Sequence, residues 1–329
     1  RGHTSFRPPF APVTFGAIAA RRIGALLEPI RRTPIRGWHQ SNGAVFELVG
    51  QWHRPYYTPR DGENMQQAVD REVRAARTSL GIMDATTLGK IDIKGQDANE
   101  FLNRVYTNSW SKLKIGKCRH RIMLGDDGMV IDDGVTSRIG ENHYVMTTTT
   151  GNAARVMNKL EDWLQTEWPQ LKVYLPSVTE QFSTISINGP YAPNLMKKLC
   201  PYTDLSNEKF PHMSFQYINI NGVNCRVMRI SFTGEMCYEI NVPSSYAKEL
   251  WSKCFELGKE YNITPYGTEA MHLLRAEKGF IIVGQETDGT VTPVDLQMDW
   301  IVSKKKYDFI GKRSLYRSDT MREDRKQYV

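Results

Sequence analysis

Residues 215–230, FQYININGVNCRVMRI, contain the signal on which the fold assignment rests. Asn221-Gly222 stands between two apolar runs, and Asn-Gly in that setting is the strongest short signal for a β-hairpin with a two-residue turn. The runs 215–220 and 225–230 are therefore predicted to be neighbouring antiparallel strands.

The predicted elements on both sides of this hairpin follow one order twice. Apolar residues three to four positions apart indicate helices, and alternation or a short apolar run indicates strands. Strands are predicted near 88–95, 121–124, 129–131, 144–146, 182–187, 215–220, 225–230 and 238–242, and helices near 64–80, 97–105, 151–164, 192–199, 246–261 and 270–278. The order β-α-β-β-β-α occurs twice, and no G-x-G-x-x-G motif follows a strand. We therefore expect an α+β fold of two antiparallel units packed face to face, not a doubly wound parallel sheet.

Composition and charge narrow the classes of partner. The chain has 329 residues, 40% hydrophobic and 24% charged, as is usual for a soluble globular protein. Residues 1–40 hold seven arginines and a single acid, so most of the net charge of +7 lies there. The nearly neutral remainder argues against a nucleic-acid partner. Residues 1–42 are interpreted as a basic linker arm that is either solvated or docked on an acidic surface.

The sequence also limits metal chemistry and location. Five cysteines without C-x-x-C spacing and seven scattered histidines predict neither a disulfide framework nor a metal site. No apolar run reaches the roughly 18–20 residues of a membrane span, and no secretory leader is recognisable. We expect a cytoplasmic protein, or one of an organelle matrix, without a membrane partner.

Ile131-Asp132-Asp133-Gly134-Val135 is the first candidate for chemistry. Side chains alternate across a strand, so only one of the two acids can face a given side. A carboxylate that faces a pocket could position a protonated amine or accept its proton. Alternatively, the pair belongs to a solvated hairpin, because Asp favours turns.

Further candidates lie in the second half of the chain. Glu235 could accept two N–H donors from an aminopyrimidine-type ring edge, or it could be an ordinary loop acid. Arg275 could bind a substrate carboxylate in a bidentate manner, or it could pair with Glu277 at the end of its helix. The long polar loop 284–293 is typical of a functional loop. Trp300 could stack on a flat ring or belong to the core.

Together these segments resemble the glycine cleavage T-protein (aminomethyltransferase) family, and more closely its version fused to amine oxidases. That version forms the C-terminal half of the alpha subunits of heterotetrameric sarcosine oxidases. The resemblance extends over nearly the whole chain. It is carried by residues 74–97, 131–135, 231–242 and 263–313, and in most detail by TSFRPPFAPVTFG (4–16), VGQWHRP (49–55), ATTLGKIDI (85–93), LQTEWP (164–169) and ITPYGTE (263–269).

The resemblance implies a fold and a division of the chain. The fold would be two ferredoxin-like antiparallel-sheet units packed together, followed by a small C-terminal barrel that is truncated here. Residues 1–42 would be the linker arm, 43–172 the first folate-binding unit, and 173–320 the second unit with the folate-site loop. Residues 321–329 would begin the truncated barrel, and we expect them to be poorly packed.

The resemblance also implies site residues. It assigns the folate-facing catalytic acid to the Asp132-Asp133 pair, and we favour Asp133. The other residues that it places around the folate are Glu235, which would bind the pterin, Tyr238, Arg275, Glu277 and Trp300.

The implied function is a tetrahydrofolate-binding module of a sarcosine oxidase. A flavin in the beta subunit would oxidise sarcosine, and this module would capture the resulting one-carbon unit as 5,10-methylenetetrahydrofolate. Folate and the amine-derived imine are the expected small-molecule partners, and the beta, gamma and delta subunits the expected protein partners. FAD, FMN and NAD are expected in the full complex but outside this part. Two alternatives remain: a stand-alone folate-dependent aminomethyltransferase or demethylase, and a non-catalytic scaffold of the oxidase.

Overall fold

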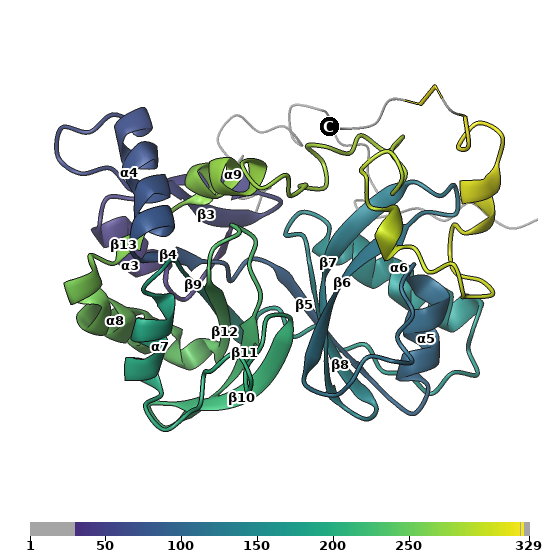
Figure 1. Cartoon of the computed structure of the whole chain (residues 1–329), viewed down its shortest axis with the longest axis horizontal. Coiled ribbons are helices and arrows are strands. Elements are labelled where there is room, and N and C mark those ends of the chain that lie inside the picture. Colours follow the sequence, from purple (N-terminus) through teal and green to yellow (C-terminus); the bar gives the residue numbers. More distant parts are fainter. Residues whose placement is uncertain (1–29, 323, 326–329) are drawn as a thin grey trace, which may run out of the picture.

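The computed structural model describes residues 30–322, 324 and 325, and it confirms the repeated order of elements. Figure 1 shows the two units that result. The first contains β5 (Gly89–Lys94), α5 (Ala98–Val105), β6 (Lys117–Leu124), β7 (Val130–Gly140), β8 (His143–Thr148) and α6 (Ala153–Thr166); the second contains β9 (Phe182–Asn188), α7 (Ala192–Leu199), β10 (Ser214–Ile220), β11 (Val223–Arg229), β12 (Cys237–Pro243) and α8 (Ala247–Gly258). The predicted hairpin joins β10 to β11. Asn221 and Gly222 both have positive φ, 51° and 84°, as a type I′ turn requires.

The two units meet edge to edge within one ten-stranded sheet of order β13-β4-β9-β12-β11-β10-β6-β7-β8-β5. In this order β4 is Gly81–Asp84 and β13 is Thr264–Pro265. The junction is narrow, because β10 and β6 pair through Ser214 and Lys117. The expectation that the units pack face to face is therefore wrong. They lie side by side (Figure 1), since strand pairing continues from one unit into the next.

Helices cover one side of the sheet in each unit. Under α7 and α8, apolar residues such as Ile185, Val227 and Trp251 form one core. Under α5 and α6, a second core contains Ile93 and Met146. Because neighbouring residues of a strand point to opposite faces, the residues between these core positions point to the other side of the sheet.

The segment before the first unit packs largely against the second. β1 (Arg31–Arg32), β2 (Val45–Val49) and β3 (Trp52–Tyr57) form a small sheet, while α4 (Met65–Thr78) contacts α9 (Thr268–Ala276). α3 (Arg36–Ser41) carries Trp38, whose ring centroid lies 5.4 Å from that of Trp251. β4 pairs with β9 of the second unit.

Two boundaries therefore differ from the division expected from the sequence. The arm expected over 1–42 is folded from residue 30 onward, and residues 1–29 lie outside the described part. Ile35 explains the docking, since this side chain is fully buried in the core of the second unit. Residues 81–84 belong to the sheet of the second unit, although the expected boundary placed them in the first.

The segment after α9 crosses to the first unit and covers the side of its sheet that the helices leave open. Val291, Leu296 and Phe309 pack on Ile122 and Leu124 of β6. Figure 1 shows this segment, which includes the short helices η3 (Asp299–Ile301) and η4 (Arg313–Tyr316), beside β6 and β7. The range 173–320, expected to form the second unit, therefore includes a segment that packs on the sheet of the first unit.

Of the range 321–329, expected to begin the barrel, the structure describes residues 321, 322, 324 and 325, and these four residues form no strand. Residues 323 and 326–329 of that range lie outside the described part. Met321 is exposed, but Arg325 is held by Asp295, with a distance of 2.5 Å between Nη2 and Oδ2.

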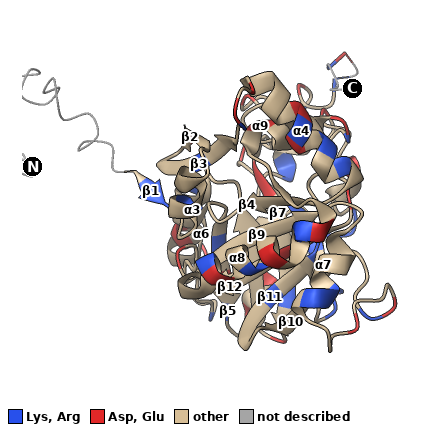
Figure 2. Cartoon of the chain, turned by 90° about the vertical axis from the view of Figure 1, so that its left-hand side faces the viewer, with Lys and Arg blue, Asp and Glu red and all other residues tan. Residues whose placement is uncertain are grey.

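Charge on the helical side of the second unit is mixed. Figure 2 shows basic and acidic positions interspersed over α4 and α8, whereas the charged residues of α7 are the two basic residues Lys197 and Lys198. Of the helices that the structure describes, none has the length and apolar character needed to cross a membrane.

Candidate functional site

A cleft of about 1590 Å³ lies on the sheet face opposite the helices and is lined by both units. The first unit contributes parts of β6, β7 and β8, and the second contributes parts of β9 and β12. The loops 230–233 and 278–289 and the segment 296–303 line it as well. Because the two units share the cleft, a ligand in it could be held from both sides.

Alternation along β7 separates the two adjacent acids. Asp133 lines the cleft, whereas Asp132 is buried on the helix-facing side. On the neighbouring strand β6, Ile122 is paired with Asp133 and packs against the segment after α9. Met123 is paired with Asp132 and faces the core under α5 and α6. The structure therefore brings only Asp133 into contact with the cleft.

Asp132 forms a buried ion pair with Arg121, in which Nη1 and Oδ2 are 3.5 Å apart. Thr149 adds a hydrogen bond from its hydroxyl to Oδ1 at 2.7 Å. Burial raises the pKa of Asp132 to about 7, and the charge of Arg121 opposes that shift. Gly134 makes room for this arrangement, because a Cβ there would lie 2.2 Å from the carbonyl oxygen of Thr147 and 3.2 Å from Arg121 Nη2.

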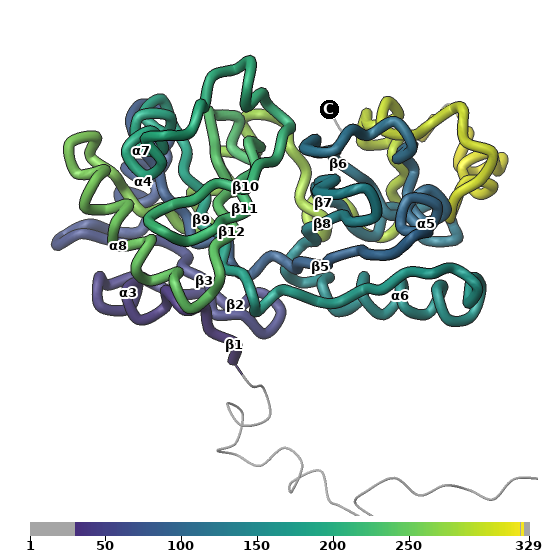
Figure 3. The backbone as a smooth tube through the Cα atoms, turned by 90° about the horizontal axis from the view of Figure 1, so that it is seen from below, coloured from purple at the N-terminus to yellow at the C-terminus, as the bar shows by residue number. Residues whose placement is uncertain are grey.

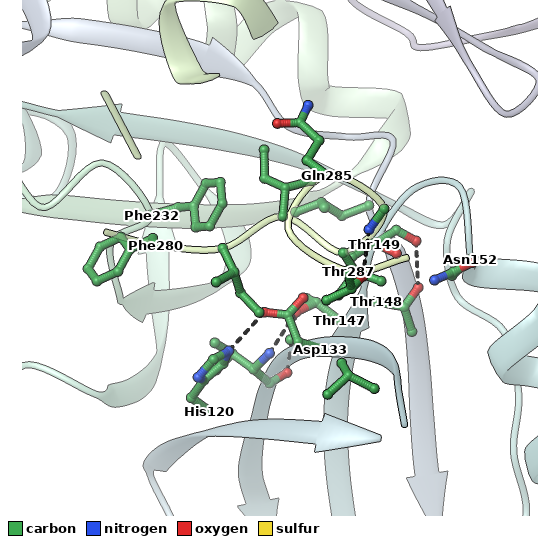
Figure 4. A pocket seen from close by; sticks show the side chains of 18 of the residues that line it. His120, Asp133, Thr147, Thr148, Thr149, Asn152, Phe232, Phe280, Gln285 and Thr287 are labelled. Carbon is green, nitrogen blue, oxygen red and sulfur yellow. Dashed lines mark hydrogen bonds and ion pairs between the residues drawn. The ribbon is translucent and has the colours of Figure 1, made fainter. Parts of the chain in front are cut away.

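Asp133 is partnered on the cleft side by a histidine. Its Oδ2 lies 3.0 Å from Nε2 of His120, which is on the neighbouring strand β6. The side chain of Asp133 retains 13% exposure, so it can contact a ligand in the cleft. Figure 4 shows this pair beside Thr147 and Thr148. A carboxylate that is oriented by an imidazole and open to a cleft can hold or accept a ligand proton.

Two aromatic rings stand on the second-unit side of the cleft. Phe232 and Phe280 stack with their ring centroids 6.3 Å apart and their planes inclined by 19°, and both line the cleft (Figure 4). They come from different loops, 231–236 and 279–289. Such flat apolar faces are suited to contact with a planar ring.

Two arginines fix the loops that carry these rings. Arg77 of α4 donates to Glu235 at 2.7 Å, to Glu277 at 2.6 Å and to the carbonyl oxygen of Thr233 at 2.5 Å. Arg275 of α9 donates to the carbonyl oxygen of Phe280 at 3.0 Å and to Glu286 at 2.6 Å. The two arginines therefore tie α4, α9 and both loops together.

The second unit contributes an acid of its own, Glu239 on β12. It is buried and lines the cleft, and its carboxylate makes no hydrogen bond to another residue of the described part. Burial raises its pKa to about 7, which the nearby charge of Lys90 opposes. An acid in this condition lacks the donors that an ionised carboxylate normally has, and a ligand could supply them.

Sequence reasoning selected several residues that the structure places elsewhere. Asp133 and Trp300 line the cleft, and the Trp300 ring lies 6.5 Å from that of His120. Asp132, Tyr238, Glu235, Glu277 and Arg275 are not among the lining residues. Tyr238 packs against Phe210 in the core under α7 and α8, because β12 alternates and turns Glu239 to the cleft instead. Glu235 and Glu277 form ion pairs with Arg77, and Arg275 forms an ion pair with Glu286 of the loop after α9.

One of the residues missed by sequence reasoning had a signal in the sequence. On β12 the apolar residues Tyr238, Ile240 and Val242 alternate with the polar residues Glu239 and Asn241, so alternation alone places Glu239 on the face opposite Tyr238. Phe232, Phe280 and His120 had no local signal, because only the tertiary structure brings their loops and strands together. In the described part, no group of three or more His, Cys, Asp or Glu side chains could hold a metal ion.

Comparisons with known proteins identify relatives of this arrangement. A family model described as the GCVT N-terminal domain matches residues 35–306. The chain is 56% identical over its whole length to sarcosine oxidase subunit alpha from Corynebacterium sp. (strain P-1), but it spans only 34% of that protein. It is 30% identical to an aminomethyltransferase from Thermoanaerobacter pseudethanolicus, over 88% of this chain and 75% of that protein. The crystal structure of the glycine cleavage system aminomethyltransferase T from Bartonella henselae superposes with a TM-score of 0.76 at 23% identity, covering 87% of this chain and 73% of the other.

Proposed function

The chain belongs to the family defined by the GCVT N-terminal domain, and from this premise we propose that it is the tetrahydrofolate-binding part of a cytoplasmic sarcosine oxidase alpha subunit. There it captures the one-carbon unit released by amine oxidation as 5,10-methylenetetrahydrofolate. The similarity to named alpha subunits over the entire chain supports this assignment.

One observation carries the proposal: Asp133 is the acid of β7 that lines the cleft, with His120 as its partner and Glu239 on the other unit. The cleft offers an acid from each side and a stacked aromatic pair near its rim. A reduced pterin combines a flat ring, a row of ring N–H donors and amine nitrogens, so it is chemically complementary to this lining.

Tetrahydrofolate, when bound, supplies two neighbouring amine nitrogens that share one carbon. Glu239 would accept hydrogen bonds from the N–H edge of the pterin ring, since an ionised carboxylate accepts two donors at once. Phe232 and Phe280 would contact the ring face and exclude water. Asp133, oriented by His120, would hold or accept the proton at an amine nitrogen. Fixing both nitrogens beside one carbon source provides the orientation on which such a step depends.

The test is the substitution Asp133→Asn. It keeps the shape of the side chain but removes the proton acceptor, so formation of methylenetetrahydrofolate should slow by about 10²- to 10⁴-fold. The rate would be measured under anaerobic conditions with formaldehyde or an imine as the carbon source. Asp126→Asn, in the exposed turn between β6 and β7, is the matched control and should leave the rate unchanged. A normal rate in Asp133→Asn, with folding intact, would show that the assignment is wrong.

The rest of the proposed enzyme lies outside this chain. We propose the beta, gamma and delta subunits as partners, with FAD, FMN and NAD bound elsewhere in the assembly, and sarcosine-derived imine as the carbon donor. Purification of the native protein tests this part: co-purification of a flavin-containing subunit supports it. Isolation of a flavin-free, folate-dependent protein would favour the second candidate, a stand-alone aminomethyltransferase, which the 30% identity to such an enzyme supports.

A further inference from the structure

Arg54 of β3 is a buried cation that the mechanism above does not use. Its side chain lines the cleft, and the residue is only 8% exposed. Burial lowers the pKa of the guanidinium, yet an arginine remains protonated in proteins. A full positive charge is therefore held inside the cleft wall.

This charge lacks the partners that a buried guanidinium normally has. Nη1 donates one long hydrogen bond, 3.4 Å, to the hydroxyl of Thr150, and Nε has no acceptor in the described part of the chain. Glu47 stands opposite Arg54 on β2, but its carboxylate accepts a hydrogen bond from Thr268. Asp84 is also nearby and is bonded to the hydroxyl of Thr33 at 2.6 Å. Neither acid forms an ion pair with Arg54 in the described structure, and an unpaired buried charge costs folding free energy.

The start of α6 lies next to this guanidinium. Residues 149–152, which precede α6, line the same cleft, and so does Arg155 in the first turn of that helix. No side chain caps that first turn, because Asn152 donates to the carbonyl oxygen of Ile131 at 2.7 Å. Its N–H groups are therefore available to an anion. A Cβ at Gly50 would lie 3.8 Å from Gly151, and Figure 3 shows the β2–β3 hairpin beside the strands of the first unit.

We propose that Arg54 and the amino-terminal turn of α6 form a subsite for a carboxylate of the molecule that occupies the cleft. A planar guanidinium binds a carboxylate through two parallel hydrogen bonds, and the helix terminus adds donors and a favourable dipole. The ligand would supply the hydrogen-bond acceptors that the described part of the chain does not provide to this guanidinium. The identity of that ligand rests on the proposed function, whereas the chemical class of the subsite does not.

The proposed reaction offers two sources of such a carboxylate. One is the glutamate tail of the folate. The other is the glycine part of the imine, whose carboxylate would be anchored while its carbon faces Asp133. Thr149, Thr150 and Asp133 line the same cleft, so a carboxylate held at Arg54 would share that cleft with the acid.

The experiment compares the variants Arg54→Gln and Arg54→Met with the wild-type protein. The control is Arg74→Gln, because Arg74 is an exposed arginine on α4. Calorimetric titration would compare tetrahydrofolate, tetrahydropteroate, which lacks the glutamate, and glycine. The rate of methylenetetrahydrofolate formation would be measured from formaldehyde with and without glycine. Thermal unfolding serves as the structural readout. Arg54→Met should unfold at the wild-type temperature or above it, because it removes an unpaired buried charge.

A subsite for the folate tail predicts that Arg54→Gln weakens tetrahydrofolate binding by about 10- to 100-fold and leaves tetrahydropteroate unchanged. A subsite for the imine predicts unchanged binding of both folates, together with loss of glycine binding and of the glycine-dependent rate. Equal loss for tetrahydropteroate, or no change in any measurement, would overturn the proposal. If wild-type protein binds no folate but binds glycine in an Arg54-dependent manner, the proposed function fails and the carboxylate subsite stands.

Discussion

β7 and β12 present their acids to the cleft in the same way but support them differently. Each strand carries a cleft-facing acid, Asp133 or Glu239, directly after a residue that faces the helices. In β7 that preceding residue is Asp132, which is ion-paired to Arg121; in β12 it is Tyr238, which belongs to an apolar core. Asp133 has His120 as a partner, whereas Glu239 has no hydrogen bond in the described structure. The difference suggests a division of roles: one unit supplies an acid prepared to move a proton, and the other supplies an acid prepared to receive ligand donors.

The largest expected effect comes from the support behind Asp133. Arg121→Met leaves Asp132 buried without its counter-ion, which typically costs about 3–5 kcal/mol of the free energy of unfolding. Tyr238→Phe, the matched change behind Glu239, should cost less than about 1 kcal/mol, because the Tyr238 hydroxyl makes no hydrogen bond in the described part of the chain. Chemical denaturation would measure both.

A control keeps this prediction specific to the ion pair. The double substitution Arg121→Met with Asp132→Leu should recover most of the lost stability, since an apolar replacement of both partners is often neutral or stabilising. Equal stability of the two single variants would mean that the strands are not supported differently.

The second effect is a pH dependence from Glu239. Its pKa is raised to about 7 in the folded protein, while in the unfolded chain it lies near ~4.3. The folded state therefore binds more protons between those values, and the contribution of Glu239 to stability falls as pH rises from about 4 to 7. The upper limit is about 3–4 kcal/mol, from 1.36 kcal/mol per unit. Glu239→Gln should reduce the slope by the share of Glu239 and leave the share of Asp132, whose pKa is also raised to about 7. Denaturation at several pH values would measure the difference.

The affinity for the ligand should depend on pH in the opposite direction, although the same residue, Glu239, is responsible. If Glu239 accepts pterin N–H groups as a carboxylate, the affinity for tetrahydrofolate should rise as pH increases through about 7. Glu239→Gln should bind more weakly and lose that rise. An affinity that is independent of pH in both proteins would contradict the role given to Glu239.

The smallest effect concerns the loops near Glu239. Arg77→Ala removes the hydrogen bonds that link α4, α9 and the 231–236 loop. We expect a loss of about 1–2 kcal/mol in stability, because the pair is only partly buried. Tetrahydrofolate affinity should fall by about threefold to tenfold as Phe232 and Phe280 lose their fixed positions. Arg74→Gln, one turn earlier on α4, should change neither quantity.

Local chemistry was sufficient to predict several elements of the fold. Asn221-Gly222 fixed a hairpin because both residues tolerate positive φ. α7 begins and ends where its apolar spacing predicts. Asp97 shows the limit of local reasoning: Asp is a preferred residue directly before a helix, but the Asp97 carboxylate accepts a hydrogen bond from the backbone of Lys172 and does not cap α5. The edge-to-edge junction through Ser214 and Lys117 had no local signal either.

For the candidate site, as for the fold, local sequence patterns predicted some residues and missed those that depend on tertiary contacts. Alternation showed that only one acid of the Asp132-Asp133 pair could face the cleft, and the resemblance favoured Asp133, which does so. On β12 the prediction selected Tyr238 and the turn residue Glu235, while the acid that lines the cleft is Glu239. Arg54 was missed because Pro55 argues against a strand at this position, and because the missing hydrogen-bond partner of its Nε is a tertiary property.

A crystal structure of the protein with bound tetrahydrofolate tests the joint use of the two acids most directly. We expect the N–H edge of the pterin at the carboxylate of Glu239 and an amine nitrogen within hydrogen-bonding distance of Asp133, in one molecule that contacts both units. A folate bound outside the cleft, or bound within it without contact to either acid, would contradict the account.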